Sequence, residues 1–175
     1  MIPNSRFRGG FTVVELLIII SVSALLMSMV IFYSRGGEKQ IILLREQAKL
    51  VSTILRSKSL AIQTFAQPGR ACGYGVHFIQ NGPGGAGYIL FNDLADNCST
   101  SDRRYSGEAE DSEKFLLDGL LKFIQPVPED ILFIPPDPQV VLIPDQLEAI
   151  ITIASLDEQL SAKIKITNAG QVTIQ

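Results

Sequence analysis

Few side chains of this chain combine types and spacing that could do chemistry. His77 is the only histidine, and Cys72 lies five residues before it. A cysteine and a histidine form a nucleophilic pair only when their side chains meet, and His77 lies in the middle of an expected strand. One histidine and two distant cysteines, Cys72 and Cys98, also lack the spacing of a zinc site. The sequence therefore predicts that the chain is not an enzyme.

Two polar or glycine-rich stretches could bind a ligand. The run from Gly82 to Gly87 lacks the Lys-Ser/Thr ending of a phosphate loop and lies between expected strands, which favours a hairpin loop. Asn92, Asp93, Asp96 and Asn97 offer oxygen ligands that would suit Ca²⁺, but they do not follow the twelve-residue calcium loop. We expect a solvated turn there. The sequence predicts no metal and no cofactor, and it leaves open whether an ion or another ligand binds between Asn92 and Asn97.

Glu15 is the residue whose chemical environment is most unusual. It is the only charge in the apolar run from Phe11 to Tyr33, which is long enough to cross a bilayer as a helix. A carboxylate at the centre of a membrane helix costs on the order of 2.5–3.5 kcal/mol on insertion scales. The run contains no Lys or Arg to serve as its partner. Cutting the chain after Gly10 would supply one, because the new amine at Phe11 would be a cation beside Glu15.

The same residues carry a resemblance. The basic leader with Arg6 and Arg8, the Gly10-Phe11 junction, Glu15 and the apolar run that follows resemble the N-terminal segment of type IV pilins and pseudopilins. The resemblance implies cleavage between Gly10 and Phe11 by a prepilin peptidase, which also methylates the Phe11 amine. It further implies that the helices of many subunits pack into a filament core, with Glu15 acting in assembly.

A secretory signal and a plain membrane anchor are the alternatives for this segment. An ordinary secretory signal has a shorter apolar region, and its cut site follows that region. A plain single-span anchor accounts for the length and the flanking charge but leaves Glu15 without a role. The alternative function is therefore a membrane-anchored extracytoplasmic binding module that does not polymerise.

The net charge, the basic leader and the two cysteines limit the possible partners, orientation and disulfide pairing of the chain. The net charge is −3, and loss of the leader would make it more negative, so no nucleic acid is expected as a partner. Arg6 and Arg8 should keep the N-terminus in the cytoplasm, leaving the C-terminal domain outside the cytoplasmic membrane. An exported domain can form a disulfide, so Cys72 and Cys98 either pair or remain free thiols.

Four segments are expected: a leader at 1–10, a transmembrane or filament-core helix at 11–33, an amphipathic continuation at 34–66 and a globular β-domain at 67–175. Gly36 and Gly37 predict a weak point where the apolar run ends. The amphipathic helix should bury one stripe against the β-domain. This expected stripe consists of Leu44, Ala48, Val51, Leu55, Ile62 and Phe65.

The fold class is α+β, with the long helix packed on an antiparallel domain that forms a two-sheet sandwich or a partly open barrel. Strands are expected at 75–79, 88–91, 113–117, 120–124, 131–134, 140–143, 150–154, 163–167 and 171–174. Asp118-Gly119 predicts a hairpin between 113–117 and 120–124, and Gly170 suits the left-handed position of a C-terminal hairpin. The prolines from Pro126 to Pro144 should place their segments at sheet edges or bulges.

The β-domain carries a second resemblance. The stretches 73–78, 88–93 and 166–172 resemble the soluble domain of minor pseudopilins of the H type. The two resemblances together imply a structural subunit, either a pilin or a pseudopilin, of a pilus or of a type II secretion-like filament. Its partners would be other pilin or pseudopilin subunits, the prepilin peptidase and N-methyltransferase, the inner-membrane assembly platform and membrane lipid. The sequence does not tell which machine the subunit serves, or whether the subunit is major or minor.

Overall fold

The computed structural model describes residues 12–64, 71–136 and 139–175. The fold is α+β, as predicted, with an apolar N-terminal helix and two antiparallel sheets. Helix α1 spans Val13–Thr64, and the chain divides into two compact units between Glu38 and Lys39. This boundary falls just after the two glycines, Gly36 and Gly37.

The segment Val13–Val30 of α1, in the first unit, is apolar and exposed. Val13–Val30 is the one segment of the described chain that is long and apolar enough to cross a membrane, and none of it is buried. Ser21 and Ser28 donate their hydroxyls to the carbonyls of Ile18 and Leu25, at 2.9 and 2.7 Å. Because these hydroxyls are satisfied within the helix, they would not need a partner in lipid.

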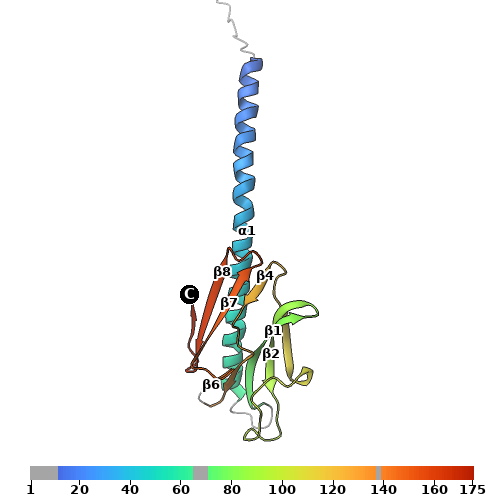
Figure 1. The fold of residues 1–175 in the computed structure, drawn as a ribbon, viewed down its shortest axis with the longest axis vertical. Coiled ribbons are helices and arrows are strands. Elements are labelled where there is room, and N and C mark those ends of the chain that lie inside the picture. The colour runs from blue at the N-terminus through green and yellow to red at the C-terminus, as the bar shows by residue number, and fades with distance from the viewer. Residues whose placement is uncertain (1–11, 65–70, 137–138) are drawn as a thin grey trace, which may run out of the picture. The chain divides into compact units, whose positions relative to one another are not determined.

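The second unit, Lys39–Gln175, contains the rest of α1 and both sheets (Figure 1). The first sheet has the order β3-β2-β1-β5-β6 and the second has the order β4-β7-β8-β9, with every pairing antiparallel. The strands are β1 (Gly73–Gly82), β2 (Gly85–Asp93), β3 (Asp111–Leu116), β4 (Leu121–Ile124), β5 (Asp130–Ile134), β6 (Gln139–Ile143), β7 (Glu148–Ser155), β8 (Ser161–Thr167) and β9 (Val172–Ile174). A short 3₁₀ helix, η1 (Glu108–Glu110), precedes β3.

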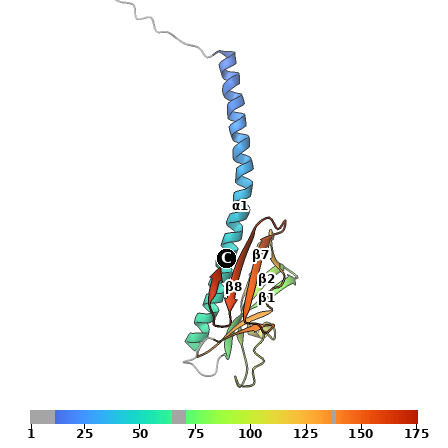
Figure 2. The ribbon, with the colours of Figure 1, turned by 60° about the vertical axis from the view of Figure 1, so that its left-hand side comes forward.

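One apolar core joins the helix to both sheets. Leu50 and Ile54 of α1 are fully buried in the same cluster as Val76 and Phe133 of the first sheet and Ile151 of the second. Figure 2 shows β7 and β8 alongside the second part of α1. Along β7, alternate residues face this core, so Glu148, Ile150 and Thr152 lie on the opposite face of the second sheet.

The helical stripe that enters this core differs from the expected one. The buried apolar residues of α1 are Leu43, Leu50, Ile54 and Ala61, whereas Leu44, Leu55 and Ile62 are about half exposed. The prediction was therefore shifted by one position at Leu44, Leu55 and Ile62, whereas the expected Val51 is partly buried against the core, and Phe65 lies outside the described residues. Each buried residue has an apolar neighbour next to it in the chain, so periodicity alone fits either of two faces about 100° apart. Polar side chains also enter the core face, including Glu46, Thr53 and Ser57.

The predicted hairpin at Asp118-Gly119 is also wrong. β3 pairs with β2 in the first sheet, whereas β4 pairs with β7 in the second. The turn itself forms: Leu120 donates its N–H to the Asp118 carboxylate at 3.0 Å, and Leu121 donates to the Asp118 carbonyl at 2.9 Å. It carries the chain from one sheet to the other, so the turn chemistry was correct and the strand pairing was not.

The C-terminal hairpin and the proline segments had different outcomes. β8 pairs with β9, and Gly170 has φ 72°, which confirms the left-handed position. The prolines were expected to place their segments at edges or bulges. β6, which precedes Pro144, is an edge strand as expected, but β5 lies between β1 and β6 inside its sheet. The prolines flank its ends, where no ladder hydrogen bond is needed.

Candidate functional sites

Glu15 lies in the first turn of α1, and Thr12 caps that turn. The Glu15 N–H donates to the Thr12 hydroxyl oxygen at 3.2 Å. Thr12 and Glu15 have the T-x-x-E spacing of a capping box, a signal that is present in the sequence but was overlooked in favour of the buried charge. The Glu15 carboxylate itself has no partner among the described residues. Gly10 and Phe11, the expected cleavage and methylation positions, lie outside the described residues.

Cys72 and Cys98 form a disulfide with a Cα–Cα distance of 5.1 Å. The pairing that the sequence left open is thus present in the structure. It links the start of β1 to the segment that follows β2. Because Cys72 is bonded to Cys98, it cannot act as a nucleophile with His77.

His77 instead holds a loop against the outer face of the first sheet. Its Nδ1 atom lies 2.7 Å from an oxygen of the buried Asp130 carboxylate, and its ring stacks on Tyr105 at a centroid distance of 4.4 Å. The Tyr105 N–H donates to the other Asp130 oxygen at 3.3 Å, and its hydroxyl donates to Asp111 at 2.7 Å. Burial and Asp111 together raise the pKa of Tyr105 to about 12. These contacts hold the loop around Tyr105 on the first sheet.

The same loop is anchored by two more buried acids. Glu110 accepts hydrogen bonds from the N–H groups of Leu94 and Ser106, at 3.2 and 2.7 Å. Asp93 is 1% exposed and accepts a hydrogen bond from the Ser101 hydroxyl through one oxygen, while its Oδ1 atom has no partner. Burial raises the pKa of Asp93. The segment 94–110 is therefore tied down at several points.

Two of the amide oxygens between Asn92 and Asn97 are engaged in hydrogen bonds to serines. Asn97 accepts hydrogen bonds from Ser99, and Asn92 accepts one from Ser112 at 2.7 Å. Within the part of the chain that the structure describes, no group of three or more His, Cys, Asp or Glu side chains is placed to hold a metal ion.

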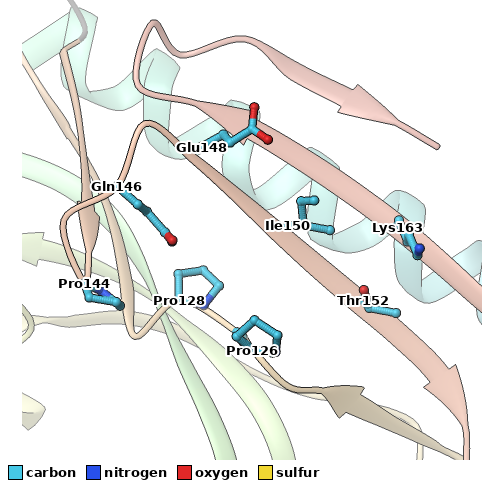
Figure 3. A pocket seen from close by; sticks show the side chains of 9 residues that line it. Pro126, Pro128, Pro144, Gln146, Glu148, Ile150, Thr152 and Lys163 are labelled. Atoms are coloured by element: carbon cyan, nitrogen blue, oxygen red, sulfur yellow. The ribbon is translucent and has the colours of Figure 1, made fainter.

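A groove of about 340 Å³ lies on the face of the second sheet that points away from α1 (Figure 3). One wall consists of Pro126, Pro128 and Pro144, which come from the segments before β5 and after β6. The two segments are joined by a 2.6 Å hydrogen bond from the Glu129 N–H to the Ile143 carbonyl. The position of this wall is therefore fixed by the first sheet.

The opposite side of the groove is the outward face of β7 and β8. Ile150 is 41% exposed there, and Thr152 of β7 pairs directly with Lys163 of β8. Figure 3 shows the Gln146 side chain extending toward Pro128. Sequence reasoning missed this groove because its residues come from three separate segments that only the strand pairing brings together.

Comparison with known protein families, curated proteins and solved structures finds no match to this chain.

Proposed function

We propose that this chain is a prepilin-like subunit, processed after Gly10 and assembled into a filament through α1. The observation that carries the proposal is a single acid, Glu15, at the start of an apolar helical segment that is wholly exposed. In this proposal the apolar segment and the amphipathic segment act as one long helix, and the two sheets form a sandwich-like domain that packs on its second half.

The mechanism is physical and involves no bond chemistry by this chain after processing. Before assembly, the apolar segment anchors the subunit in the membrane. On assembly, Glu15 pairs with the methylated Phe11 amine of a neighbouring subunit, so both charges leave lipid together. An unpaired buried charge would be costly, so the pairing selects the register of the incoming subunit.

A feature of the second unit supports helix packing between subunits. Ile41, Leu55 and Ile62 are 68, 49 and 49% exposed and lie on one line of α1, because their positions differ by multiples of seven. The domain thus leaves a second apolar stripe of the helix uncovered. Such a stripe would be covered by a neighbouring helix in a filament core.

The second candidate is a membrane-anchored binding module that does not polymerise. The groove on the second sheet favours it, since a module needs a site. The first-turn position of Glu15 also favours it, because a negative charge there interacts favourably with the dipole of its own helix.

Substituting Glu15→Gln separates these candidates. The observed cap uses the backbone N–H of residue 15, which Gln also provides, so the variant keeps the cap and loses only the charge. The filament proposal expects Glu15→Gln to be absent from sheared filaments while it stays in the membrane, with Glu38→Gln on the same helix incorporated normally. Normal incorporation of Glu15→Gln would refute the proposal.

Intact-mass analysis of extracted protein should find an N-terminus at Phe11 bearing one methyl group, and a retained Met1 would refute processing.

A further inference from the structure

We propose that the groove over β7 and β8 binds an extended peptide segment of a partner protein, in which an apolar side chain and an aspartate or glutamate lie two residues apart. The groove lies wholly within the unit Lys39–Gln175. The inference therefore goes beyond the proposed function and applies equally to a filament subunit and to an anchored module.

Three polar side chains face the groove without an internal partner. Among the described residues, the Gln146 amide, the Thr152 hydroxyl and the Lys163 ammonium make no side-chain hydrogen bond or ion pair. The rest of the lining is largely apolar, including the three prolines and Ile150. An apolar surface with a few convergent, uncommitted polar groups is typical of a ligand site.

The charges of the groove select an acidic ligand. Glu148 is the only acid in the lining, and it is paired with Lys165 at 2.6 Å. The remaining charge, Lys163, is a cation without a counter-ion in the described chain. A carboxylate from the ligand would supply that counter-ion.

The outward face of the second sheet offers side chains to an extended segment. β7 is hydrogen-bonded to β8 over Glu148–Ala154 but to β4 only over Thr152–Ser155, so within the described chain Glu148–Ile151 has no strand partner on the β4 side. The three prolines of the groove, Pro126, Pro128 and Pro144, have no N–H groups to donate. In this proposal the ligand lies along the outward face of β7 and β8 and is held there through its side chains.

The spacing between Ile150 and Lys163, which would contact the apolar and the acidic side chain of the ligand, determines the proposed motif. Lys163 is opposite Thr152, and Lys165 is opposite Ile150. The apolar contact at Ile150 and the cation at Lys163 are thus two residues apart along the strands, roughly 7 Å. In an extended peptide, side chains at positions i and i+2 share one face and have the same spacing. An acid next to the apolar residue would point away from Lys163.

Three synthetic peptides of matched length test this motif. The first is acetyl-Gly-Glu-Ser-Leu-Ser-Glu-Gly-amide, which presents the spacing in both chain directions. The second replaces both Glu by Gln, and the third exchanges Glu with Ser so that each acid is adjacent to Leu. Each is titrated into the full-length protein in detergent micelles, and the methyl signal of Ile150 is followed by NMR.

We expect the first peptide to shift the Ile150 signal and to bind roughly twofold to fivefold more tightly than either control, as expected for an exposed ion pair. Lys163→Gln should remove this preference. Arg104→Gln, which deletes an exposed cation outside the groove, should keep it. Equal affinities of the three peptides, an unchanged preference in Lys163→Gln or no shift at Ile150 would each overturn the proposal. A shift that depends on protein concentration and not on peptide would assign the groove to a second copy of the chain, which also overturns it.

Discussion

Removing the Cys72–Cys98 disulfide should destabilise the second unit strongly while leaving its native contacts in place. The bridge joins residues that are 26 positions apart. In the chain-entropy description, closing a loop of that length stabilises the folded state by about 3.5 kcal/mol, because it restricts the unfolded chain. The double substitution Cys72→Ala and Cys98→Ala should lose about this amount.

The native loop has enough other anchors to stay where it is. The Glu110 carboxylate is hydrogen-bonded to Leu94 and Ser106, and the Asp130 carboxylate is hydrogen-bonded to His77 and Tyr105. These contacts do not depend on the disulfide. The loss of stability should therefore come from the unfolded state, with little change in the folded structure.

Thermal unfolding of the full-length protein in detergent measures the effect. The unit Lys39–Gln175 has roughly 140 residues, so a loss of about 3.5 kcal/mol should lower Tm by on the order of 10 °C. The chain has no tryptophan, so tyrosine fluorescence is the probe. Reduction of the wild-type protein should give the same shift.

Hydrogen exchange shows where the effect acts. Amides of the segment 94–110 should lose protection only as much as the whole unit does. A Tm loss of less than about 3 °C, combined with selective deprotection of that segment, would refute the reasoning. It would show that the bridge holds the native loop and contributes little through the unfolded chain.

Three further predictions concern single polar groups. The Tyr88 hydroxyl is buried without a hydrogen bond of normal geometry, so Tyr88→Phe should leave the denaturation midpoint unchanged or raise it; a large decrease would contradict this. Burial raises the pKa of Asp93, so the wild type should lose stability relative to Asp93→Asn as pH rises from 4 through that raised pKa; the opposite slope in unfolding experiments would be contrary evidence. Lys39, 2.7 Å away, lowers the pKa of Asp157 to about 2. Carboxyl NMR should show the titration moving up toward 3.8 in Lys39→Gln, and an unmoved titration would mean that Lys39 is not the cause.

The elements that sequence reasoning placed correctly are those with strong local signals. The C-terminal hairpin has period-two alternation and a glycine at the position that needs positive φ. The apolar segment Val13–Val30 follows from length and composition alone. In both cases the deciding information lies within about twenty neighbouring residues.

The errors come from choices that only long-range packing makes. Adjacent apolar pairs such as Leu43 and Leu44, or Ile54 and Leu55, leave the buried face of α1 undecided until the sheets cover one side. The Asp118 turn is equally compatible with a hairpin and with a crossing between sheets. The groove was missed for the same reason.

The cap at Thr12 changes how Glu15 should be interpreted. A negative charge in the first turn of a helix gains about 0.3–1 kcal/mol from the helix dipole, whereas a carboxylate deep in a bilayer costs about 2.5–3.5 kcal/mol. The dipole therefore offsets only part of the cost once the helix start is drawn into an apolar environment. A Gln at this position would serve the cap without that cost. This remaining cost is the reason that our filament proposal pairs Glu15 with a neighbouring amine, a partner that an isolated anchor would lack.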